Sequence, residues 1–188
     1  MSTYSRTFSA ITYAGVVIFV VVVALLQLAQ PGYEPSTQFM SELALGNFGG
    51  FFFFAFLGLA AATAATAANI HTHNSAFPLV VMLGLAAACF LGAGMITLAT
   101  STQTHVLLVA AAFVLCGLCM YLLPLTIAAF SGVGNRIASW GSCAVMVTAT
   151  ALGDIILPGI AQRLSAAALL FWLSLVAWCL ARSARCHQ

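Results

Sequence analysis

The stretch Phe8–Leu28 reads FSAITYAGVVIFVVVVALLQL and contains no charged side chain. About 20 consecutive apolar residues are enough for an α-helix to cross the hydrocarbon core of a bilayer. A short polar segment follows at Pro31–Gly46, PGYEPSTQFMSELALG, and further long apolar runs come after it. The stretch therefore predicts a membrane-spanning helix, and the pattern around it predicts several more.

The whole chain is as poor in charge as this stretch. Its 188 residues are 63% hydrophobic and 4% charged, lysine is absent, and the mean hydropathy is +1.13. A soluble domain normally carries roughly a quarter charged residues, so the composition excludes that class. The alternation typical of a barrel is absent, which leaves helices as the way to satisfy the backbone in lipid. The net charge of +2 is too small to predict a nucleic-acid partner.

The apolar runs predict an all-α fold, a polytopic membrane bundle of six transmembrane helices in one domain that covers residues 1–188. Short connections make consecutive helices antiparallel neighbours. Small residues in the second and third runs, including Gly84, Ala88 and Gly92, predict that these two helices pack most closely. The expected spans are Phe8–Leu28, Asn47–Ala68, Pro78–Ala99, Thr104–Phe130, Ser139–Leu157 and Leu164–Ala181.

The arginines predict the orientation. Four of them (Arg6, Arg136, Arg182 and Arg185) fall on one side of the expected bundle, and only Arg163 falls on the other. Because arginine is enriched in cytoplasmic segments, both termini are expected in the cytoplasm and the polar segment Pro31–Gly46 outside. The expected location is the cell inner (plasma) membrane, as a multi-pass protein.

Scarce polar residues converge on the outward end of this arrangement. All three carboxylates of the chain are expected there, together with Arg163 and the histidine that opens the fourth span. Ionisable groups near the hydrocarbon are costly and usually mark function. The candidate catalytic residues are Ser41, Glu42, His105 and Asp154, and the candidate substrate-binding residues are Tyr33, Gln38, Asn47 and Arg163.

In the catalytic interpretation, His105 is a general acid or base whose tautomer a carboxylate holds, and Ser41 is a nucleophile. No metal ligands and no cofactor are assigned, although one histidine with two or three carboxylates also suits zinc or a harder cation. Structural alternatives stay open. Ser41 and Glu42 are also a capping pattern, Asp154 and Arg163 are a candidate ion pair, and His105 is tolerated at a wet interface.

At PGYEPSTQFMSELALG the chain resembles a bacterial family of membrane proteins, the domain of unknown function 998. Members have six predicted spans, an outer loop with an aromatic-proline stretch, here Tyr33-Glu34-Pro35, and a Ser-Glu-Leu motif, here Ser41-Glu42-Leu43. A histidine opens their fourth span, as His105 does here. Members often carry an aspartate before that histidine, where this chain has Ala99–Thr102, and Asp154 is the expected substitute.

That family is distantly similar to eukaryotic six-span proteins of the autophagy-modulator and GPI-lipid-remodelling group. The resemblance implies, by analogy, work on lipids. We therefore expect an outward-facing polar site that binds or modifies a lipid or lipid-linked molecule, with membrane lipids as partners. Whether the protein is an enzyme is left open. The alternative is a non-enzymatic accessory subunit, packed against a membrane protein or a second copy of the chain, or a small transporter.

Overall fold

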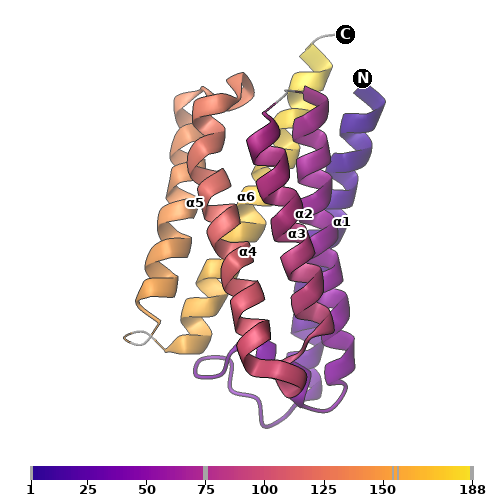
Figure 1. The fold of residues 1–188 in the computed structure, drawn as a ribbon, viewed down its shortest axis with the longest axis vertical. Coiled ribbons are helices and arrows are strands. Elements are labelled where there is room, and N and C mark those ends of the chain that lie inside the picture. Colours follow the sequence, from indigo (N-terminus) through magenta and orange to yellow (C-terminus); the bar gives the residue numbers. More distant parts are fainter. Residues whose placement is uncertain (1, 74–75, 154, 156, 187–188) are drawn as a thin grey trace.

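The computed structural model describes residues 2–73, 76–153, 155 and 157–186, and within them the chain is helical without any strand. Six long helices run up and down side by side (Figure 1). Three short 3-10 helices, η1 (Met40–Leu45), η2 (Gly49–Phe51) and η3 (Ala128–Phe130), lie in the connections. The long helices are α1 (Ser2–Ala29), α2 (Phe52–His73), α3 (Phe77–Met95), α4 (Leu98–Thr126), α5 (Val133–Ala151) and α6 (Pro158–Cys186).

Five of the described helices, α1–α4 and α6, are long and apolar enough to cross a membrane. This indicates a helical membrane protein, as expected. Helix α5 falls short of that standard because Asn135, Arg136 and several serine and threonine residues dilute its apolar content. Whether α5 spans the bilayer stays a prediction.

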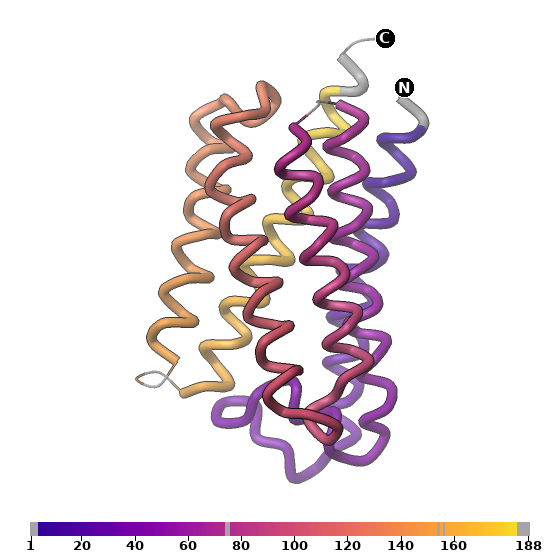
Figure 2. Tube along the Cα trace, viewed as in Figure 1, coloured from indigo at the N-terminus to yellow at the C-terminus, as the bar shows by residue number. Residues whose placement is uncertain are grey.

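The two ends of the bundle differ in what they carry. Both termini lie at one end, and the long connection between α1 and α2 lies at the other, with the α3–α4 turn (Figures 1 and 2). The arrangement agrees with the predicted placement of both termini on one side. Which side of the membrane each end faces stays a prediction.

Two helix boundaries differ from the expected ones. Helix α5 covers Val133–Ala151, where the apolar pattern predicted Ser139–Leu157, and α6 begins at Pro158, where it predicted Leu164. Proline suits the first turn of a helix because its missing N–H is not needed there and its φ angle is already helical. Pro158 therefore opens α6, and Gln162 and Arg163 lie inside a helix.

The tightest approach in the bundle joins α1 to α2. A Cβ atom added to Gly15 would lie 2.2 Å from the carbonyl oxygen of Gly58, and one added to Gly58 would lie 2.8 Å from that of Gly15. Helices α2 and α3 also approach closely, since a Cβ atom added to Gly94 would lie 2.7 Å from the Cβ atom of Phe56. The predicted contact at Gly84 was wrong, because a Cβ atom there would meet nothing within 4 Å.

Helices α4, α5 and α6 are joined by a buried polar network near the end that carries the termini. Pro124 has no N–H to give to the Met120 carbonyl one turn earlier. The Ser139 hydroxyl donates to that carbonyl at 2.7 Å, and the Trp172 indole donates to Ser139 at 2.8 Å. Both side chains are fully buried. The network fixes α4 to α5 at this end.

Candidate functional site

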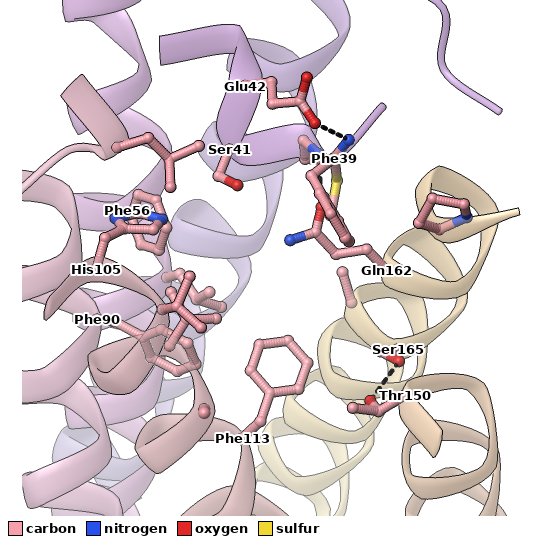
Figure 3. Close-up of a pocket in the computed structure, with 18 of the residues that line it drawn as sticks. Phe39, Ser41, Glu42, Phe56, Phe90, His105, Phe113, Thr150, Gln162 and Ser165 are labelled. Carbon is pink, nitrogen blue, oxygen red and sulfur yellow. Dashed lines mark hydrogen bonds between the residues drawn. The ribbon is translucent and has the colours of Figure 1, made fainter. Parts of the chain in front are cut away.

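A cavity of about 640 Å³ occupies the end of the bundle opposite the termini. Its wall comes from the connection after α1 and from each of the helices α1–α6, and Figure 3 shows part of this lining. Most of the lining is apolar, and its aromatic part consists of Phe19, Phe39, Phe52, Phe56, Phe90 and Phe113. The volume lies in the usual range for a small-molecule site.

The exposed part of the lining shows where the cavity opens. On α4, Thr102, Val106 and Ala110 line the cavity and are exposed on the protein surface. Thr150 on α5 is exposed as well. Phe39 and Leu45 of the connection are exposed too, so the exposed lining residues lie both on the side of the bundle, along α4 and α5, and at its end.

His105 lies in the cavity wall and is almost completely buried, with 2% of its surface exposed. Its Nδ1 atom lies 2.9 Å from the carbonyl oxygens of Ala93 and Ile96, at the end of α3. Carbonyl oxygens only accept hydrogen bonds, so Nδ1 carries the proton. The ring thereby satisfies carbonyls that the end of α3 leaves without partners. Backbone carbonyls therefore fix the tautomer of His105, and no carboxylate among the described residues does so.

The other ring nitrogen of His105 has no partner. Its Nε2 atom is buried and makes no hydrogen bond in the described part of the protein. With the proton on Nδ1, Nε2 of the neutral ring is an acceptor. The ring also packs edge-on against Phe56, with 5.5 Å between centroids. A buried polar atom left without a hydrogen bond destabilises the folded protein by about 1–3 kcal/mol. A ligand that donates a hydrogen bond to Nε2 would remove this cost.

Ser41 comes to the same cavity from η1. The sequence MSELAL folds as a 3-10 helix that buries Met40, Ser41 and Leu43 under the connection. The Ser41 hydroxyl lines the cavity and has no hydrogen-bond partner among the described residues. The structure thus brings Ser41 and His105 to one cavity, and no hydrogen bond joins them.

Glu42 also lines the cavity, but its carboxylate is occupied. One oxygen accepts the backbone N–H of Phe39 at 3.0 Å, and the other accepts the Gln38 amide at 3.4 Å. This is the return half of a capping box, in which a glutamate three residues into a helix holds the N-cap backbone. The contacts of Glu42 are therefore those of a helix-capping residue, which was the structural alternative to a catalytic role.

Gln162 is a polar side chain of α6 that lines the cavity and was not among the residues predicted from the sequence. Its Oε1 atom accepts the Met40 backbone N–H at 2.5 Å. Because an N–H must donate to oxygen, the orientation of the amide is fixed and its NH₂ group remains (Figure 3). Elsewhere in the wall, the hydroxyl oxygens of Thr150 and Ser165 lie 3.0 Å apart, and each hydroxyl also bonds to the Met146 carbonyl.

Three of the four candidate substrate-binding residues hold the connection and do not line the cavity. Arg163 donates to the carbonyl oxygens of Pro35, Gln38 and Gly159, and to the phenol oxygen of Tyr33. The phenol in turn donates to the Phe39 carbonyl at 3.0 Å. The Gln38 side chain bonds to Glu34 and Glu42. The contacts anchor the connection to α6, and the predicted role in binding remains a prediction.

Two candidate residues lie elsewhere. Asn47 is exposed, and its carbonyl accepts the Gln30 amide at 3.1 Å. Asp154 lies outside the described residues, so its predicted pairing with Arg163 or His105 stays a prediction. The described residues contain no group of three histidine, cysteine or carboxylate side chains that would hold a metal ion.

The pKa values of the connection follow from its contacts. Burial raises the pKa of the Tyr33 phenol above its ordinary value, although the hydrogen bond and the charge of Arg163 act in the opposite direction. Glu34 is exposed, and the hydroxyl and N–H of Ser36 lower its pKa. Both groups are therefore held in the protonation states that their hydrogen bonds require near neutral pH.

The fold and the cavity define a class, a helical membrane protein with a partly enclosed pocket at one end of its bundle. Comparison with protein families identifies the family within that class. The chain matches the family described as a protein of unknown function, DUF998, over residues 13–179, and it belongs to that family. Comparison with curated proteins and with solved structures finds no match.

Proposed function

We propose that this protein binds an amphipathic lipid or lipid-linked molecule in the cavity beneath η1. One observation carries the proposal. The cavity has a polar end that includes Ser41, His105 and Gln162, and a mostly apolar remainder that extends to Phe113 and Leu169, where the hydroxyls of Thr150 and Ser165 are already hydrogen-bonded. Eight residues of α4 separate His105 from Phe113, which is a rise of about 12 Å. The division matches a molecule with a polar headgroup and an apolar chain.

The position of the mouth supports the same proposal. We place the entrance between α4 and α5, where the exposed lining side chains include Val106 and Ala110. A molecule from water would meet an apolar entrance, whereas a lipid in the plane of the membrane would meet one like its own surroundings. We place the protein in the plasma membrane, with the polar end at the depth of the outer headgroups.

Photocrosslinking tests the proposal. The protein is reconstituted in vesicles with lipids that differ in headgroup and carry a diazirine in the acyl chain, and crosslinked residues are mapped by mass spectrometry. At least one lipid is expected to crosslink to lining residues such as Phe113 or Leu169. Replacing Ala110 by Trp should block the mouth and remove that crosslink. The matched control is Val114→Trp, on the exposed face of α4 outside the cavity.

If every lipid in the panel labels only the outer faces of the helices, the proposal fails. The same holds if Ala110→Trp and Val114→Trp label like the wild type. If lipids with several different headgroups label the cavity, the binding site is supported, and the competition experiment described in the next subsection measures its selectivity.

One observation favours a second candidate, acyl transfer or hydrolysis on the bound lipid. Ser41 and His105 both line the cavity, and neither the Ser41 hydroxyl nor the His105 Nε2 atom has a hydrogen-bond partner among the described residues. In this reaction Nε2 takes the proton as the oxygen of Ser41 or of a water attacks an ester carbonyl, and returns it to the departing alcohol. Glu42 supports the step only by holding η1.

A fluorophosphonate probe tests this candidate, because such probes modify activated serines. Labelling of Ser41, lost in Ser41→Ala and in His105→Asn, would support it. Absence of labelling, together with no release of fatty acid from a bound ester lipid, would reject catalysis and leave the binding proposal standing. Should binding fail as well, the accessory role beside a membrane partner or a second copy becomes the remaining interpretation.

A further inference from the structure

The polar end of the cavity decides which lipid binds, if the proposed function is correct. Lipid tails are about as apolar as leucine side chains, so an acyl chain gains little when it leaves the bilayer for the apolar part of the cavity. The headgroup must supply the selectivity. Its partners are the free polar atoms of three residues, Ser41, His105 and Gln162.

The cavity provides no cation for an anionic headgroup. Glu42 is the charged side chain in the described lining, and it is negative. Arg163 is the only arginine of the chain near this end, and its guanidinium is engaged by four oxygens of the connection and of α6. A buried anion without a paired charge is strongly disfavoured. Phosphate headgroups are therefore poor ligands here.

The free polar atoms also have fixed hydrogen-bonding roles. His105 Nε2 is an acceptor because the proton is held on Nδ1 by two carbonyls. The Gln162 NH₂ group is a donor because its oxygen is held by the Met40 N–H. The Ser41 hydroxyl fits either role. A complementary headgroup therefore presents one donor and one acceptor, and no charge.

We propose that the ligand is a neutral lipid whose headgroup carries a free hydroxyl beside a carbonyl. The hydroxyl donates to His105 Nε2, and the carbonyl accepts from the Gln162 amide. Acylated glycerols and N-acylated amino alcohols both have this chemistry. A ligand of this kind satisfies the buried Nε2 atom, which the described residues leave unpaired.

Competition against the photocrosslinking probe tests the inference. Wild-type protein in phosphatidylcholine vesicles is labelled with a diazirine-bearing diacylglycerol, and unlabelled diacylglycerol, ceramide or phosphatidic acid is added. Diacylglycerol or ceramide is expected to compete at least tenfold better than phosphatidic acid. Whichever of the two neutral lipids competes better identifies the source of the headgroup.

Two variants locate the contacts. In His105→Asn the side-chain amide can still donate to the Ala93 and Ile96 carbonyls, but the Nε2 acceptor is gone. In Gln162→Glu the oxygen that accepts the Met40 N–H remains, but the donor is gone. Each is expected to weaken diacylglycerol binding at least tenfold. Thr37→Asp adds a negative charge on the exposed connection at the same end, outside the cavity lining, and should bind normally.

Equal or better competition by phosphatidic acid would overturn the inference, and so would normal binding by both variants. These results differ from failure of the proposed function, in which no lipid labels the lining at all. If His105→Asn fails to fold, the competition with wild-type protein and the Gln162→Glu variant still decide.

Discussion

The guanidinium of Arg163 donates a hydrogen bond of 2.7 Å to the phenol oxygen of Tyr33, although the two residues lie 130 positions apart in the chain. It also stacks on the Tyr33 ring, with 5.6 Å from the guanidinium carbon to the ring centroid. The pair joins the connection after α1 to the start of α6. The connection, whose residues 39–42 cover one end of the cavity, is therefore held in place by a contact outside the cavity.

Replacing Arg163 by lysine should loosen the connection after α1 from α6. Lysine keeps the charge but cannot reach several acceptors with one planar group. We expect a loss of about 1–2 kcal/mol in the free energy of unfolding, and faster proteolysis within residues 31–39. Thermal unfolding in detergent and limited proteolysis measure the two effects. Arg182→Lys, at an exposed site over Trp178, is the control and should change neither.

Stability should also depend on the Tyr33 proton. Burial raises the pKa of Tyr33 above its ordinary value of 10.0, so the folded state holds the phenol proton more tightly than the unfolded state. The contribution to stability is complete below about pH 10 and is lost as the pH rises through the folded pKa. The Tm of the wild type should therefore fall more steeply above pH 10 than that of Tyr33→Phe. Parallel alkaline profiles would contradict the prediction.

The Gly15–Gly58 approach predicts a sharp contrast between two glycine substitutions. Gly15→Ala would place a Cβ atom 2.2 Å from a backbone oxygen and should cost about 1–3 kcal/mol through overpacking. Gly84→Ala meets open space and should be neutral or slightly stabilising, because alanine favours the helix. Thermal unfolding of both proteins in the same detergent checks this. Equal Tm changes would show that α1 and α2 do not pack as described.

The Ser139 hydroxyl predicts the cost of an interhelical polar contact. Ser139→Ala would leave the Trp172 indole and the Met120 carbonyl unpaired, and we expect a loss of about 1–2 kcal/mol. Ser142→Ala is the matched control, since that hydroxyl bonds only to Ala138 in its own helix. Chemical denaturation compares the two. A further Pro124→Ala change should recover part of the loss, because it restores an N–H for the Met120 carbonyl.

The orientation can be tested with two introduced cysteines. Thr37 is exposed on the connection after α1, and Gly132 is exposed at the start of α5, near the opposite end. In a background without the native cysteines, an impermeant maleimide should label Thr37→Cys on intact cells. Gly132→Cys should react only after permeabilisation. The reverse result would show that the arginine distribution predicts the wrong orientation.

The sequence predicts the bundle well because apolar length depends on composition alone. It also predicts that Ser41, Glu42 and His105 gather at one end, and the cavity contains all three. It cannot predict their partners. The tautomer of His105 is fixed by carbonyls at the end of α3, and backbone atoms leave no mark in a sequence.

The sequence predicted Arg163 as the site residue of this helix, but Gln162 lines the cavity, and the difference has a geometric cause. Adjacent helical residues point about 100° apart, so only one of them faces the cavity. The apolar pattern placed the start of α6 six residues too late, which left the rotation of the helix unknown. Arg163 was predicted because it is charged, whereas the uncharged Gln162 lines the cavity and accepts the Met40 N–H.

If the proposed lipid enters the cavity between α4 and α5, this side entrance changes what binding strength means for the protein. A ligand that reaches the site within the plane of the bilayer arrives by two-dimensional diffusion, and its occupancy follows its mole fraction among the surrounding lipids. A modest preference for one headgroup then suffices to fill the cavity when that lipid is abundant. The protein would empty as the membrane composition shifts, so its bound state would report the composition of the lipids around it.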